Sequence, residues 1–102
     1  MADSAYTKSV INNVYSKMNT TSNARCKTRF PDDQLKYQMC SHQAMADNAR
    51  VLATRLRGQL GGCERTENPE RCTTTISKLI EYLDEKQEEH ESHIDQLRDL
   101  EG

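Results

Sequence analysis

The sequence has no tryptophan, one phenylalanine and no long apolar run. A membrane-spanning helix needs roughly 20 consecutive apolar residues, so no membrane span is expected. Large core-forming residues are also scarce, because leucine, isoleucine, valine and phenylalanine number 8, 4, 3 and 1 among 102 residues. This fraction is below the ~20% at which disorder becomes a concern, but disorder also requires a high net charge, and here it is −2. We therefore expect one thin-cored domain over residues 1–102, stabilised by something besides hydrophobic burial.

Motifs for catalysis and for nucleic-acid recognition are missing as well. There is no G-x-S-x-G, no Walker loop and no H-E-x-x-H, the spacings that place a nucleophile, a phosphate or a zinc ion. Cys40 and His42 are close in sequence, but two residues apart on a helix they point to different faces. Few aromatic side chains and no reading motif also disfavour nucleic-acid binding. The sequence thus predicts a protein that is not an enzyme, takes no cofactor and binds no nucleic acid.

The sequence does contain helical periodicity. Apolar residues recur at steps of three and four, which predicts helices at about 5–18, 31–60 and 69–98. Asp3 or Ser4 is expected to cap the first of them. No strand-like alternation of any length is present, so the predicted fold class is all-α.

The ends of these segments have residues that are typical of helix boundaries. The polar run 19–23 is rich in residues that hydrogen-bond their own backbone, which favours a loop. Pro31 suits the first position of the second helix, and the glycines at 61–62 suit its end. Asn68 and Pro69 predict the N-cap and the first residue of the third helix.

The second and third helices should form a hairpin. Each is about 30 residues, or about 45 Å long, and a short connector at 61–67 makes them antiparallel neighbours. The shorter first helix would pack on this hairpin and complete a three-helix bundle. After Leu83 the apolar face of the third helix becomes increasingly polar. Its last turns are therefore expected to fray or to meet a partner, including a second copy of the chain.

The four cysteines, Cys26, Cys40, Cys63 and Cys72, are an even number that allows three pairings. Cys63 and Cys72 flank the hairpin connector. Cys40 lies roughly 30 Å from that connector along the second helix, whereas a disulfide needs Cα atoms within about 7 Å. We therefore predict bridges Cys26–Cys40, with Cys26 in a loop, and Cys63–Cys72, each contributing about 2–3 kcal/mol by restricting the unfolded chain.

Disulfides would also indicate the compartment. They persist mainly in secreted, periplasmic and ER-lumen proteins, so a periplasmic or secreted location is expected, although the sequence as given shows no secretory signal at its start. Two alternatives stay open at this point. The thiols can be buried and free in a cytosolic protein, or they can bind zinc, although zinc sites usually have closely spaced C-x2–4-C pairs that are absent here.

Three histidines interrupt the apolar stripes of the hairpin. Counting from the connector, His42 comes opposite His90, and His93 follows one turn later. Such imidazoles can converge on a divalent metal. Alternatively, they form a polar layer that fixes the register of the two helices. An intermediate interpretation is a seam between the helices that responds to pH, because charging two facing imidazoles would push the helices apart.

Charge is distributed unevenly along the chain. Residues 81–102 contain nine acidic and two basic residues, a balance of −7, whereas residues 1–80 contain twelve basic and seven acidic ones, a balance of +5. Basic residues cluster at 25–36 and at 50–57. The first cluster can contact phosphates and the acidic third helix a basic partner, or all of these are solvated helix faces that partly neutralise one another within the hairpin.

Taken together, these features predict a small exported, non-enzymatic protein-binding module that acts as an inhibitor, immunity or regulatory protein on a partner protein. A thin helical bundle offers long rigid faces and little concavity, so we expect function on its surface. Two alternatives are a metal-binding protein that uses His42, His90 and His93, and an assembly protein that dimerises through the third helix.

Overall fold

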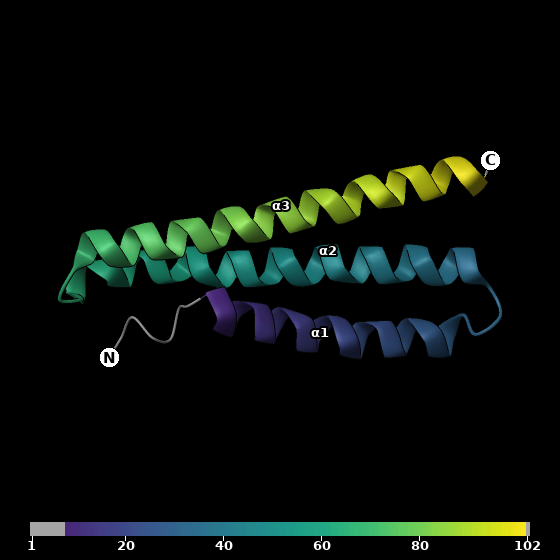
Figure 1. Cartoon of the computed structure of the whole chain (residues 1–102), viewed down its shortest axis with the longest axis horizontal. Coiled ribbons are helices and arrows are strands. Elements are labelled where there is room, and N and C mark those ends of the chain that lie inside the picture. Colours follow the sequence, from purple (N-terminus) through teal and green to yellow (C-terminus); the bar gives the residue numbers. More distant parts are fainter. Residues whose placement is uncertain (1–7, 102) are drawn as a thin grey trace.

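The computed structural model describes residues 8–101 and consists of three helices with a short 3₁₀ segment (Figure 1). Helix α1 spans Lys8–Arg29, α2 spans Gln34–Gln59, the 3₁₀ segment η2 spans Leu60–Arg65, and α3 spans Pro69–Glu101. The described residues contain no strand, and the molecule measures 53 × 23 × 18 Å. The predicted all-α fold, an antiparallel hairpin with a third helix packed on it, is confirmed.

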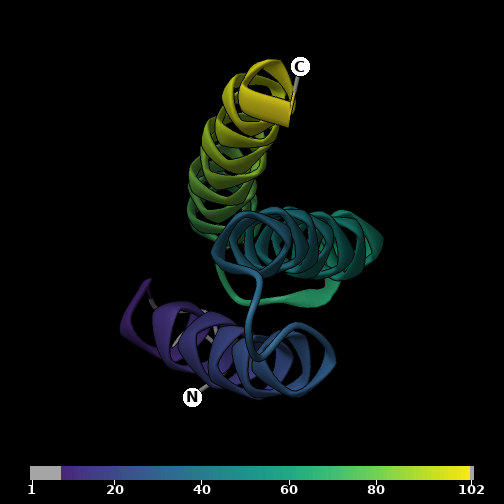
Figure 2. The same cartoon turned by 90° about the vertical axis from the view of Figure 1, so that its right-hand side faces the viewer.

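Helix α2 is the central element. Viewed from the end that holds the α1–α2 connection and the C-terminus, it lies between the other two helices (Figure 2). The first turn of α1 reaches α3, because the Lys8 ammonium lies 4.9 Å from the centroid of the Tyr82 ring. Towards the end seen in Figure 2, α1 and α3 lie on separate sides of α2.

The main core occupies the half of the molecule nearer the hairpin connector. It is formed by Ile11, Tyr15, Ala49, Leu52, Ala53, Leu56, Cys63, Ile76, Leu79, Ile80 and Leu83. Three further apolar residues of the described chain are buried outside this cluster: Cys26, Ala46 and Ile94. The thin core that the composition predicts is therefore concentrated at one end, which we call the connector end; the other is the open end.

The predicted boundaries of the first helix are wrong. The loop expected at 19–23 is helical, and α1 continues to Arg29. The hydroxyl groups of Thr20 and Thr21 donate to backbone carbonyls four residues earlier, at 3.0 and 3.1 Å, so these polar side chains are satisfied without leaving the helix. The expected caps, Asp3 and Ser4, lie outside the described residues.

The asparagine and serine residues of the same run face α2 and form a polar seam. Asn48 of α2 donates to Asn19 Oδ1 and to Ser22 Oγ, both at 3.1 Å. The Ser41 hydroxyl, also on α2, donates to Asn23 Oδ1. Hydrogen bonds to a second helix thus replace the turn-forming bonds that such residues make in isolation.

Helix α2 begins three residues later than predicted. Asp33, not the region of Pro31, forms its N-cap, and the Asp33 side chain accepts a hydrogen bond from the Lys36 backbone N–H at 3.0 Å. At its other end the helix tightens into η2, so the two glycines lie within a helical turn.

Helix α3 begins at Pro69, as predicted. Asn68 Oδ1 accepts a hydrogen bond from the Arg71 N–H at 3.0 Å, the bond that defines an N-cap. The helix continues to Glu101, three residues beyond the predicted end. Buried Ile94 and the histidines of this segment contact α2 and hold it there.

Both predicted disulfides are present. The Cα atoms of Cys26 and Cys40 are 5.7 Å apart, and those of Cys63 and Cys72 are 5.5 Å apart. Cys26 lies in the last turns of α1, not in a loop. All four cysteines are bridged, so the structure does not support free thiols or thiolate zinc ligands.

Candidate functional site

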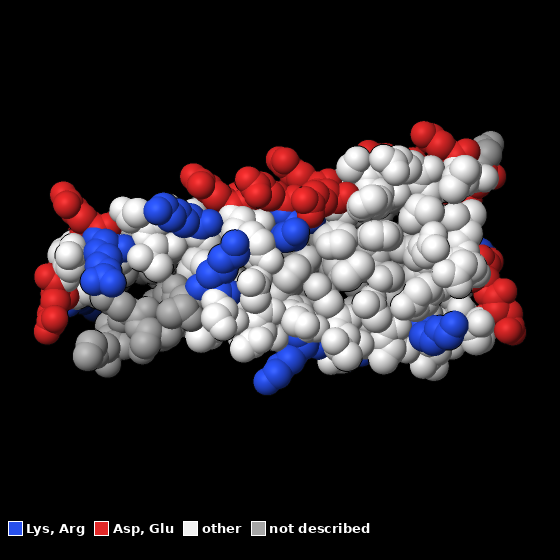
Figure 3. Space-filling view, in the orientation of Figure 1, with Lys and Arg blue, Asp and Glu red and all other residues white. Residues whose placement is uncertain are grey.

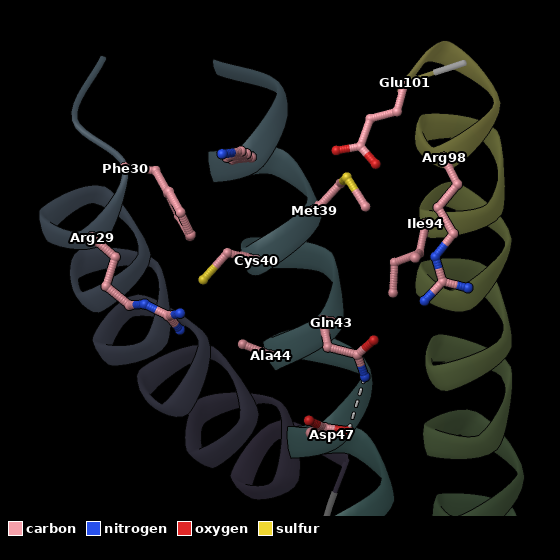
Figure 4. Close-up of a pocket in the computed structure, with 11 residues that line it drawn as sticks. Arg29, Phe30, Met39, Cys40, Gln43, Ala44, Asp47, Ile94, Arg98 and Glu101 are labelled. Carbon is pink, nitrogen blue, oxygen red and sulfur yellow. Dashed lines mark hydrogen bonds between the residues drawn. The ribbon is translucent and has the colours of Figure 1, made fainter. Parts of the chain in front are cut away.

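A groove with a volume of about 480 Å³ opens at the open end, between α1, α2 and α3 (Figure 4). Its apolar lining consists of Phe30, Met39, Ala44 and Ile94, together with Cys40. Because these residues come from α2, from α3 and from the connection that follows α1, the groove exists only in the assembled fold. The groove is wide open to solvent and lies on the surface of the bundle.

The Cys26–Cys40 disulfide positions the α1 side of the groove. Phe30 follows Cys26 by one helical turn, and its backbone N–H donates to the Cys26 carbonyl at 3.0 Å. The Arg29 guanidinium lies 5.1 Å from the centroid of the Phe30 ring, a cation–π distance. The bridge thus fixes the end of α1 on α2 and, with it, the one phenylalanine of the chain.

Charged and polar side chains line the edges of the groove. Arg29 and Lys36 line it from the α1–α2 connection, Asp47 from α2, and Arg98 and Glu101 from α3. Asp47 Oδ1 accepts a hydrogen bond from Gln43 Nε2 at 3.3 Å (Figure 4). Arg98 forms an exposed ion pair with Asp95 at 3.8 Å. Exposed pairs contribute little to stability, so these charges can exchange partners at low cost.

Beside the groove lies the histidine cluster, which we define as His42, His90 and His93. The Nδ1 atoms of His42 and His90 are 2.9 Å apart and their ring centroids 5.1 Å apart. The His93 ring stacks on His42 at a centroid distance of 4.8 Å. The predicted juxtaposition of His42 and His90 is confirmed. Next in sequence to this cluster are Gln43 and Ile94, which line the groove.

The environment of the cluster favours uncharged imidazoles. Burial is the main cause of a lowered pKa of both His42 and His90. The neighbouring His93 lowers the pKa of both further, and for His90 the effects of His42 and Lys86 add to this, while Glu89 opposes it. Both rings are therefore neutral at pH 7, and one donates its Nδ1–H to the bare Nδ1 of the other.

The structure gives no support to metal binding by this cluster. Within residues 8–101, no group of three or more histidine, cysteine, aspartate or glutamate side chains is arranged to hold a metal ion. The facing Nδ1 atoms of His42 and His90 bond each other. The arrangement matches a polar layer that fixes helix register, the second of the two interpretations of the sequence.

The surface charges separate by helix. Helix α1 contains five basic residues and no acidic one, whereas α3 contains ten acidic and four basic residues. Acidic side chains gather along the outer edge of α3 in Figure 3. Arg57 of α2 pairs with Asp84 of α3 at 2.6 Å, so the expected neutralisation within the hairpin occurs at that point.

Sequence analysis did not identify the groove residues as a site. The one available signal was the lone phenylalanine, which immediately follows the basic end of α1 and precedes Pro31. Comparison of the chain with protein-family models, with curated proteins and with solved structures finds no match. Among residues 8–101, no helix combines the length and apolar character needed to cross a membrane.

Proposed function

We propose that this protein is a small exported, non-enzymatic module that binds a segment of a partner protein in the groove and thereby inhibits, neutralises or regulates that partner. The observation that carries the proposal is the groove itself, which has an apolar lining supplied by α2, by α3 and by Phe30 after α1, and is edged by charged residues. Its volume falls within the ~300–1,000 Å³ range of ligand sites. The two disulfides support export, because such bridges persist in oxidising compartments.

The lining indicates the chemistry of the partner segment. Phe30, Met39 and Ile94 are suited to apolar side chains, and the small Ala44 leaves room for them. A helix laid in a groove presents such side chains at three- and four-residue steps. Arg29 and Lys36 at the α1 side favour acidic residues on the flank of that segment. We therefore expect an amphipathic partner helix with a narrow apolar stripe.

Site-specific photo-cross-linking in the cell that makes the protein tests this proposal. A benzophenone amino acid replaces Gln43 at the groove, and a matched control replaces Thr54, an exposed residue further along the same helix. We expect one discrete cross-linked partner from position 43 and none from position 54. The second substitution Ala44→Glu, which places a charge in the groove, should abolish the product.

Three results would contradict the proposal: no product from position 43, equal products from both positions, or a product insensitive to Ala44→Glu. A product with the mass of two copies of this chain would instead support the assembly alternative. Folding of each variant is checked by helical circular dichroism and by the count of free thiols, which should remain zero as in the parent protein.

A further inference from the structure

The last third of α3 is attached to α2 differently from the rest of that helix. We define the C-terminal arm as residues 90–101. The main core contacts α3 up to Leu83, and beyond it Ile94 is the one buried aliphatic residue of the helix within the described chain. Half-buried Leu97 lies on the same face, and two imidazole contacts join the arm to α2: the pairing of His42 with His90 and the stacking of His42 on His93. The arm therefore has few buried apolar side chains, and imidazole contacts are part of what attaches it to α2.

The same arm forms one wall of the groove. Ile94, Arg98 and Glu101 line it from α3, and all three lie on the C-terminal side of His90. Figure 4 shows Ile94 and Glu101 directed from α3 towards α2, while the Arg98 side chain runs along α3. Any change that separates the arm from α2 must therefore move this wall.

Proton chemistry limits the conditions under which the His42–His90 bond can form. A neutral pair forms it when one ring carries its proton on Nδ1 and the other does not. A singly protonated pair also keeps the bond, because the imidazolium donates Nδ1–H to the neutral ring. A doubly protonated pair carries a proton on both Nδ1 atoms and has no acceptor. Two cations would then face each other across the 2.9 Å that separates these atoms.

The surrounding charges come mainly from α3. Lys86 and Glu89 act on His90 in opposite directions. Glu85, Glu88 and Glu89 share a shallow depression with His93 on the outer side of the helix. From α1, Tyr15 lies within electrostatic range of Lys86 and Glu89, and α2 contributes His42 itself. None of these groups gives the doubly protonated pair an acceptor between its two Nδ1 atoms.

We propose that the histidine cluster is a proton-operated latch that holds the C-terminal arm against α2, so that a second proton on the His42–His90 pair releases the arm and opens the groove. The lowered pKa of both imidazoles agrees with this order of events, since burial and the neighbouring rings disfavour the charged forms. The role of the latch in partner binding rests on the proposed function, whereas the latch itself is a property of the isolated protein.

Amide hydrogen exchange of the disulfide-intact protein tests the latch, with rates converted to protection factors to remove the intrinsic effect of pH. Amides 95–100 report on the arm, and amides 78–83 beside the main core are the internal reference. The range from about pH 7.5 to about pH 5 extends well below the ordinary histidine value, as the lowered pKa of both His42 and His90 requires, while carboxylates with ordinary pKa values stay mostly ionised. We expect protection of the arm to fall by about ten-fold or more while the reference stays constant.

Two variants make the test specific to the pair. His42→Gln keeps a side chain that donates and accepts but does not gain a proton, so its arm protection should fall much less with pH than in the parent protein. His93→Gln, the matched control, leaves the His42–His90 bond in place and should retain a fall in the same direction. The latch is refuted by constant arm protection in the parent protein, or by an equal fall in His42→Gln.

Added metal ions distinguish the latch from a metal site. If zinc or copper at about pH 7.5, where imidazoles are neutral ligands, raises arm protection and a chelator reverses it, the cluster is a metal site and the latch is wrong. The exchange measurement involves no partner, so a failed cross-link at position 43 with a pH-dependent arm refutes the proposed function alone. A cross-link at position 43 together with arm protection that does not change with pH refutes the latch alone.

Discussion

At the connector end, α2 and α3 enclose a continuous apolar core, a disulfide ties η2 to α3, and the Arg57–Asp84 pair joins α2 and α3 on the surface. At the open end, α1 is joined to α2 by a disulfide and amide hydrogen bonds, and α3 by imidazoles, buried Ile94 and half-buried Leu97. Regions with few buried apolar contacts open at lower free energy than the core. We infer that the connector end sets the stability of the molecule and leaves the open end free to rearrange around a ligand.

The largest expected effects come from deleting buried aliphatic groups at the two ends. Leu83 is completely buried in the main core and Ile94 is 4% exposed at the open end. Leu83→Ala should lower the global free energy of unfolding by about 2–5 kcal/mol, because it leaves a cavity. Ile94→Ala should mainly reduce amide protection of residues 95–100, with a smaller change in global stability.

Urea unfolding followed by circular dichroism measures the first effect, and hydrogen exchange measures the second. If Ile94→Ala lowered the global stability as much as Leu83→Ala and left local protection unchanged, the two ends would unfold as one unit and the contrast between them would be lost.

Removing each disulfide should give the next largest effects. The bridges span 14 and 9 residues, for which the loop-entropy relation gives nearly equal losses of about 3 kcal/mol. The two double variants should, however, disturb different parts of the molecule. Cys26→Ser with Cys40→Ser frees the end of α1 and with it Phe30 of the groove, whereas Cys63→Ser with Cys72→Ser affects the connector.

Photo-cross-linking at position 43 distinguishes the two double variants. Loss of the cross-link in the first variant and its retention in the second are expected, at a temperature where both remain helical. Equal behaviour would show that the open-end bridge has no special role in forming the groove.

The polar seam of the open end should contribute less than the core but more than a surface ion pair. Asn48→Ala leaves Asn19 and Ser22 without their partner, which should cost about 1–3 kcal/mol because both are half-buried. Arg57→Ala is the control, since its pair with Asp84 is about half exposed and such pairs contribute about 0–1 kcal/mol. Equal losses by urea unfolding would contradict the assignment of the seam as structural.

The regularities that could be predicted from the sequence are those set by chain geometry. The distance along α2 excludes a bridge from Cys40 to the connector, and the observed pairing follows. Counting from the same connector places His42 opposite His90, where the structure has it. Asn68 and Pro69 mark the start of α3 because their preferences are local.

The features that sequence analysis missed depend on partners distant in the chain. The run 19–23 is helical because Ser41 and Asn48 on α2 donate hydrogen bonds to its polar side chains, and local preference alone predicts a loop. A helical signal was nevertheless present, since Tyr15, Ser22 and Cys26 continue one face at helical spacing. The groove depends on how α1 and α3 are placed around α2, which no local pattern encodes.

Changing the pH should have the smallest effect on the global free energy of unfolding. It is also the sharpest test of the difference between the connector end and the open end. His42 and His90 have lowered pKa values relative to the ordinary value of 6.5, so the unfolded chain binds protons that the folded chain does not. Their contribution to stability is therefore complete above about pH 6.5 and is lost as the pH falls through that value towards the folded pKa. Urea unfolding at several pH values should show this loss in the parent protein and a smaller one in His42→Gln.

The same titration links the two ends of the molecule. Once the arm is released, the histidines of the folded protein are exposed and take up protons as readily as those of the unfolded chain, so further acidification should cost no more stability through them. The loss should therefore level off while the Leu83 core remains intact. A loss that continues without levelling while arm protection stays constant would mean that the imidazoles remain buried until the whole molecule unfolds, and that the open end has no independent motion.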